Sequence, residues 1–174
     1  DYGLDFYAPQ TLLAPDGRRI MIAWMQNWAT AGAKPAHCRW FGQMTLPREL
    51  FVQDGRLCQR PVRELDTCRR QQVLHRNIPV SGEVNLPGVQ GRVVDMTVTI
   101  RPTGSEVYRW FRIHVAKDGT HDTIIRYRPN ESTLKIDRTR SGLPHDIVHT
   151  RSFLVRPQGG ELKLRIILDR FSVE

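Results

Sequence analysis

The sequence lacks the features that would assign a membrane protein or a metalloprotein. No apolar run approaches the roughly 20 residues that a membrane-spanning helix needs, so no membrane partner is expected. The three cysteines, Cys38, Cys58 and Cys68, are odd in number and lack metal-ligand spacing. They favour free thiols in a reducing compartment, with the cytoplasm slightly preferred. The six histidines are irregularly spaced, so neither a metal nor any other cofactor is expected.

The sequence also lacks an initiator Met, a signal-peptide pattern and a closing polar tail. It opens with "DYGLDFYAPQ", which has a strand-like pattern, and stops with "LRIILDRFSVE", inside another. We therefore expect a piece of a longer protein. A missing signal then says nothing about where the whole protein works.

Positive charge is in excess, but it is not concentrated. The chain has 26 basic and 18 acidic residues and a net charge of +8. The densest basic cluster, "RRQQVLHR" at 69–76, is modest, and many other basic residues occupy every second position of expected strands. A solvated sheet face explains this spacing better than phosphate binding, so no nucleic-acid partner is expected.

Alternating patterns predict antiparallel strands in the last two thirds. In Val94–Arg101 and Leu162–Asp169, apolar and polar residues alternate, as in half-buried strands. The run Val107–Val115 is expected to place Tyr108 and Trp110 on its polar face. Turn signals separate such runs, which indicates an antiparallel β-sandwich from about Val73.

The first third predicts a single sheet. Phe6–Leu13 and Arg19–Met25 flank a Pro-Asp-Gly turn, and the second run, apolar on both faces, is expected to be fully buried. Gly42–Leu50 is expected to add a third strand, and a turn at 53–55 leads to Leu57. This amount of sheet is typical of one propeller blade. We expect the blade at 1–57, a helical linker at 58–72 and the sandwich at 73–174.

Several motifs, in this order and spacing, resemble glycoside hydrolase family 32, the family of invertases, sucrose-6-phosphate hydrolases, inulinases and levanases. They are "DYGLDFYAPQ", "IMIAWMQNW", "GQMTLPREL", "RPVREL" and "LDRFSVE". The resemblance implies an all-β fold: the last blade of a five-bladed β-propeller, then a C-terminal β-sandwich that lacks its final strands. It also implies a sugar partner, sucrose, sucrose 6-phosphate or a fructan.

The resemblance implies retaining hydrolysis of a β-fructofuranosidic bond, which needs a carboxylate nucleophile and a carboxylic acid. The family carries these groups, and a transition-state Asp, in "WMNDPNG"-, "RDP"- and "EC"-like segments, and none of the three occurs here. No catalytic residue is therefore predicted, and we expect this chain alone to be inactive.

Four residues are candidates for substrate binding: Asp5, Tyr7, Trp24 and Trp28. Asp5 could accept a sugar hydroxyl or satisfy backbone amides at a strand start. Trp24 matches a family tryptophan that walls the fructose pocket, and core packing is an equally good interpretation. Tyr7 points either inward or into the blade. Trp28 either rims the pocket or anchors a long loop.

Two other hypotheses remain open. The sandwich could be a carbohydrate-binding module in which Tyr108 and Trp110, exposed on one sheet face, stack against sugar. Sheet edges left without partners could also support self-association, which a concentration-independent monomer mass would contradict.

Overall fold

The computed structural model describes residues 3–34, 36–143 and 147–174. Within these residues the secondary structure consists of β-strands and short 3-10 helices, so the predicted all-β class is confirmed. No helix in the described part of the chain is long and apolar enough to cross a membrane.

The N-terminal sheet has four antiparallel strands in the order β1-β2-β3-β4. Its strands are β1 (Tyr7–Leu13), β2 (Arg19–Trp24), β3 (Arg48–Gln53) and β4 (Arg56–Pro61). The β3–β4 connection contains only Asp54 and Gly55, both at positive φ (51° and 71°). Two such residues match the right-handed twist of the flanking strands, so the hairpin turn forms where it was predicted.

Two details of this sheet differ from expectation. The third strand begins at Arg48 instead of Gly42, and residues 42–47 join the sheet only through a bridge between Met44 and Trp24. Pro47 has no amide hydrogen to donate, so the regular hydrogen-bond ladder of the third strand begins only after it. The second strand is also not fully buried, since Ala23 is its only buried residue.

The chain leaves this sheet through a 3-10 helix, η1 (Arg63–Cys68). Residues 69–93 then form neither helix nor strand. Sandwich strands were expected from Val73, but the first is β5 (Val94–Ile100). Asn77, Gly88 and Gly91 adopt positive φ, which interrupts the extended backbone that a strand requires.

The sandwich has two antiparallel sheets. One pairs β5 with β10 (Leu162–Leu168) along their full length. The other has the order β6-β7-β8-β9, with β6 at Phe111–Val115, β7 at Asp122–Arg128, β8 at Thr133–Arg140 and β9 at Thr150–Leu154. A second 3-10 helix, η2 (Pro129–Glu131), connects β7 and β8. The expected run Val107–Val115 is a strand only from Phe111 onward.

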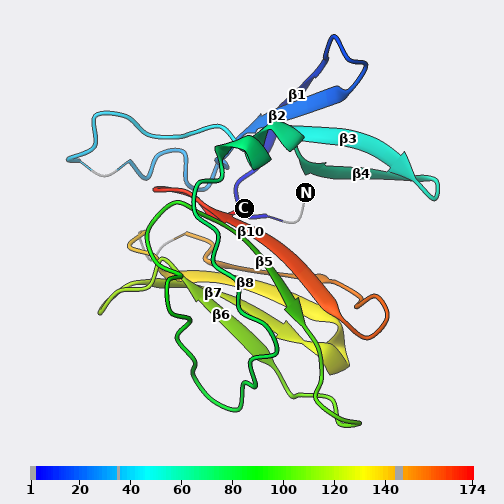
Figure 1. Ribbon diagram of the computed structural model, residues 1–174. Coiled ribbons are helices and arrows are strands. Elements are labelled where there is room, and N and C mark those ends of the chain that lie inside the picture. The colour runs from blue at the N-terminus through cyan, green and yellow to red at the C-terminus, as the bar shows by residue number, and fades with distance from the viewer. Residues whose placement is uncertain (1–2, 35, 144–146) are drawn as a thin grey trace.

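The core lies between these two sheets, formed by Ile100, Val115, Ile125, Tyr127, Leu134, Leu162 and Ile166. The predicted alternation in β10 is confirmed, because Leu162, Ile166 and Leu168 are buried while Lys163 is exposed. In Figure 1 the β5–β10 pair lies between the N-terminal sheet and the β6–β9 sheet. The β6–β9 sheet therefore has one face on the core and one face directed away from the N-terminal sheet.

Glu174 joins the N-terminal sheet to the sandwich. Its carboxylate accepts hydrogen bonds from the Leu46 backbone amide (2.6 Å) and from Arg48 Nη2 (2.7 Å). Its own backbone pairs with Ile167 of β10 (2.7 and 2.9 Å). Arg48 thus ties the N-terminal sheet to the sandwich.

A second junction connects η1 to the β5–β10 sheet. Arg165 on β10 donates from Nε and Nη2 to both oxygens of Asp95 (3.0 and 2.7 Å) and from Nη2 to Asp66 (2.9 Å). Arg69 donates to the same Asp95 carboxylate (2.8 Å). The hydrogen bond from Arg165 and that from Arg69 hold the pKa of Asp95 below its ordinary value of 3.8.

We expect Asp95→Asn to lower the free energy of unfolding by about 1–3 kcal/mol at pH 7, because charge-assisted hydrogen bonds from two arginines are lost. Since the folded pKa is lowered, this stabilisation is fully present above the ordinary value of 3.8 and is lost as the pH falls through the folded pKa. The stability difference between the two proteins should therefore shrink in acid.

Urea unfolding of both proteins between pH 7 and pH 3 measures this difference. Asp54→Asn is the matched control, because Asp54 is exposed in a turn whose positive φ Asn also tolerates. An Asp95→Asn protein as stable as the parent at pH 7 would contradict the prediction.

Candidate functional site

Three of the four candidate residues form an aromatic cluster. Tyr7 and Trp24 are direct cross-strand partners at the ends of β1 and β2. Tyr7 also contacts Trp28, with ring centroids 5.3 Å apart, and Trp24 contacts Trp28 at 6.3 Å. All of these pairs have the edge-to-face arrangement that aromatic quadrupoles favour.

The aromatic cluster is open to solvent. Trp28 is 72% exposed and Tyr7 is 42% exposed. Large aromatic side chains usually bury most of their surface, so two exposed rings beside the half-buried Trp24 form a surface suited to binding. Flat apolar rings fit the C–H faces of a sugar ring.

A β-bulge places Tyr7 in this cluster. Tyr7 pairs with Trp24, but the next pair is Gln10 with Ile22, so β1 contains one extra residue. Ala8, within the bulge, has a positive φ of 48°. A bulge of this kind redirects the side chain beside it, and here that side chain is Tyr7.

Gly42 fixes the position of Trp24. Its φ is +91°, and an added Cβ would lie 2.8 Å from Trp24 Nε1. Only glycine both adopts this backbone conformation readily and leaves the space that the indole edge fills. Gly42 is therefore part of the candidate site, although nothing in the sequence alone indicated it.

The fourth candidate, Asp5, binds two other side chains. One carboxylate oxygen accepts a hydrogen bond from Asn27 Nδ2 (2.6 Å), and the other accepts one from Arg138 Nη1 on β8. Asn27 Oδ1 accepts the Thr30 amide (3.1 Å), which closes the turn that carries Trp28. Asp5 thus links the loop of the aromatic cluster to the sandwich.

Sequence reasoning missed Asn27 and Arg138. Asn27 precedes Trp28 directly, and asparagine is common in turns, so a weak signal existed. Arg138 lies 133 residues from Asp5, and no local pattern connects them.

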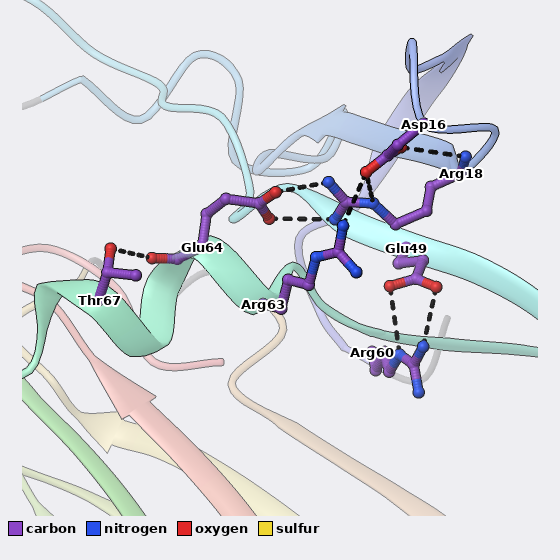
Figure 2. A network of polar contacts seen from close by, with 7 residues as sticks. All are labelled: Asp16, Arg18, Glu49, Arg60, Arg63, Glu64 and Thr67. Atoms are coloured by element: carbon purple, nitrogen blue, oxygen red, sulfur yellow. Dashed lines mark hydrogen bonds and ion pairs between the residues drawn. The ribbon is translucent and has the colours of Figure 1, made fainter.

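A group of charged residues on the N-terminal sheet and η1 is also rich in carboxylates (Figure 2). Arg18 lies between two of them, donating to Asp16 Oδ2 (2.7 Å) and to Glu64 Oε1 (2.5 Å). Beside them, Arg60 donates to both oxygens of Glu49 (2.8 and 3.3 Å). Hydrogen bonding to Arg60 lowers the pKa of Glu49, and hydrogen bonding to Arg18 lowers the pKa of Glu64.

These lowered pKa values oppose a role in general acid catalysis. A carboxylic acid that protonates a leaving group near neutral pH needs a raised pKa. The described carboxyl groups whose pKa departs from its ordinary value are all lowered: Asp16, Glu49, Glu64, Glu83, Asp95, Asp118 and Asp137. Among the residues placed by the structure, no three His, Cys, Asp or Glu side chains gather as a metal site.

Tyr108 and Trp110 do not form a second aromatic surface. Tyr108 is half-buried and packs against the sandwich core, while Trp110 is 45% exposed. The Arg112 guanidinium covers Trp110, 4.2 Å from its ring centroid. The expectation that these two rings share one exposed sheet face is therefore wrong.

We expect Gly42→Ala to destabilise the chain by about 1–3 kcal/mol, because the methyl group meets Trp24 and the backbone strain adds to the clash. Gly17→Ala is the matched control, since Gly17 also has positive φ (+83°) but nothing within 4 Å of an added Cβ. Denaturant unfolding should show a larger loss for Gly42→Ala, and equal losses would contradict the contact with Trp24.

Comparison with known proteins assigns both parts of the chain to one family. Residues 1–61 match the glycosyl hydrolases family 32 N-terminal domain, and residues 64–174 match the glycosyl hydrolases family 32 C-terminal domain. Raffinose invertase of Escherichia coli is 38% identical over 186 residues, covering 100% of this chain and 34% of the relative. Sucrose-6-phosphate hydrolase of Staphylococcus xylosus is 34% identical over 182 residues, covering 100% of this chain and 34% of the relative.

Solved structures show the same fold. Sucrose-6-phosphate hydrolase from Lactobacillus gasseri superposes with a TM-score of 0.73 at 23% identity, covering 97% of this chain and 33% of that chain. Exo-inulinase from Aspergillus awamori superposes with a TM-score of 0.68 at 21% identity, covering 100% of this chain and 36% of that chain. The chain spans about a third of the length of the curated relatives it matches. On the evidence of the two matched domains, the chain belongs to glycosyl hydrolase family 32.

Proposed function

We propose that this chain is the C-terminal part of a retaining β-fructofuranosidase-type glycoside hydrolase that acts on sucrose, sucrose 6-phosphate or fructans. The observation that carries this proposal is the open aromatic cluster of Tyr7, Trp24 and Trp28. Relatives named as invertase, sucrose-6-phosphate hydrolase and levanase match the chain over its whole length, which supports the substrate class.

In this proposal the aromatic cluster forms one wall of the sugar site. Trp28 and Tyr7 offer exposed ring surface to the sugar carbons, and Trp24, held by Gly42, supports them. Each carboxylate oxygen of Asp5 has a second lone pair beyond the bond that it already accepts, so Asp5 can also accept a sugar hydroxyl.

The proposal assigns no catalytic group to this chain. Retaining hydrolysis needs two carboxyl groups about 5–5.5 Å apart, one of them with a raised pKa. The carboxylates beside the N-terminal sheet are instead paired with arginines, as Glu49 is with Arg60. We therefore propose that the whole protein supplies the catalytic pair. The sheet of β1 to β4, which ends at Pro61 and not at the expected residue 57, then completes its propeller and precedes the linker and the sandwich.

We expect this chain alone to release no glucose or fructose from sucrose or inulin, whereas the whole protein hydrolyses at least one of them. The reason is the absence of a suitable carboxyl pair in the part of the chain that the structure describes. A reducing-sugar assay on equal molar amounts of the two proteins measures this. Hydrolysis by the short chain would overturn the assignment and direct attention to Asp5 and Glu49.

In the whole protein, we expect Trp28→Ala to raise KM about tenfold, equivalent to about 1.4 kcal/mol, with a smaller change in kcat. The exposed indole is lost as a binding surface, but no reacting group is removed. Trp110→Ala is the matched control, because Trp110 is an exposed tryptophan on the sandwich. Equal kinetics for Trp28→Ala and the parent would contradict the proposed sugar contact.

A further inference from the structure

The outward face of the β6–β9 sheet carries a row of aligned cations. Arg112 on β6 is the direct partner of Arg126 on β7, and Arg126 is the direct partner of Lys135 on β8. These positions alternate with core residues such as Ile125 and Tyr127, so the three side chains share the face directed away from the core.

This row is electrostatically unfavourable in isolation. Like charges on directly paired strand positions destabilise a sheet. In the described part of the chain, neither Arg112 nor Arg126 forms an ion pair with a carboxylate. Asp137 lies on the same face, but its carboxylate is engaged by Lys135 (3.3 Å) and by the Thr139 amide and hydroxyl (3.1 and 2.7 Å).

The row borders a hollow rather than a flat surface. The hollow has a volume of about 200 Å³ and is lined by Arg112, Ile124, Arg126, Lys135 and Asp137. All five residues are cross-strand neighbours in the register of β6, β7 and β8. Arg126 is half-buried and lies at the centre of the row, between Arg112 and Lys135.

Arg112 is held in place at one end of the row. Its guanidinium lies over the Trp110 ring, 4.2 Å from the centroid, which restricts its rotamers without neutralising its charge. Two guanidinium groups that have no carboxylate partner among the described residues line the hollow, beside the Lys135 ammonium group that also holds Asp137. This set suits a tetrahedral oxyanion, because arginine binds such groups bidentately.

We propose that this hollow binds a phosphate or sulfate group, with Arg126 as the central donor and Arg112 and Lys135 on either side. The bound anion offsets the repulsion within the row. The site lies on the sandwich, is lined by none of the residues of the aromatic cluster, and does not depend on the proposed hydrolase function. The group could be a free ion or part of a phosphorylated sugar, since the recognised chemistry is the same.

The direct test is a titration of the 15N-labelled chain with inorganic phosphate at constant low ionic strength, followed by NMR. We expect saturable shifts at the amides of β6, β7 and β8 and at the Trp110 indole. Arg126→Gln should weaken binding about tenfold or more, since a charge-assisted hydrogen bond is lost. Shifts that do not saturate, or equal affinity in the variant, would overturn the proposal.

Arg56→Gln is the matched control, because Arg56 is an exposed strand arginine on β4, and its affinity for phosphate should equal that of the parent. Lys135→Gln is a second variant that should also weaken phosphate binding. It tests the proposed donor set independently if Arg126→Gln fails to fold. Unchanged affinity in Lys135→Gln would remove Lys135 from the site and contradict the proposed donor set.

Two further measurements complete the test. Glucose 6-phosphate and glucose are titrated in parallel: tighter binding of glucose 6-phosphate than of inorganic phosphate identifies a phosphorylated sugar, and equal binding identifies the free ion. Glucose binding at the same residues would overturn the anion assignment. Without phosphate, Arg126→Gln should melt at a higher temperature at low salt, and a lower Tm would contradict the repulsion within the row.

Discussion

The ion pair between Arg48 and Glu174 is the constraint on which the arrangement of the two parts depends. It joins residues 126 positions apart, and both side chains are largely shielded, at 16% and 13% exposure. The Arg48 guanidinium also lies over the Phe6 ring and donates to Gln59 (2.9 Å). One cation therefore organises the start of β1, the strand β4 and the end of the sandwich. Removing either partner would leave a shielded charge uncompensated, which is costly.

Local features of the fold could be predicted from the sequence because their causes are local. The Asp54–Gly55 turn follows from the tolerance of these residue types for positive φ, and β10 follows from strict alternation between Leu162 and Leu168. The segment 69–93 contains enough apolar residues to resemble strands. Residues with positive φ interrupt this segment, so it forms no strand. The periodicity of a sequence does not predict the backbone conformation of a single residue such as Asn77.

The candidate site was predictable to the same extent. The hairpin that brings Trp24 beside the start of β1 was predicted, and Trp28 follows only four positions later. Tyr7 faces Trp24 only because of the bulge at Ala8, which sequence periodicity does not indicate. The role of Gly42 could not be predicted, because it depends on which edge of the Trp24 indole lies against the backbone. The contact of Asp5 with Arg138 depends on how the sandwich packs against the N-terminal sheet, a long-range arrangement that no short pattern encodes.

The position of Asp5 has a thermodynamic consequence. Its carboxylate holds Asn27, which shapes the Trp28 turn, and Arg138, which belongs to β8. The order of that turn and the docking of the sandwich thus share one group, so they are linked equilibria. By reciprocity, a molecule that binds better to the ordered turn strengthens sandwich docking by the same factor, and firmer docking improves its binding equally. Through Asp5, the sandwich is thereby coupled to the order of a surface to which it contributes no aromatic ring.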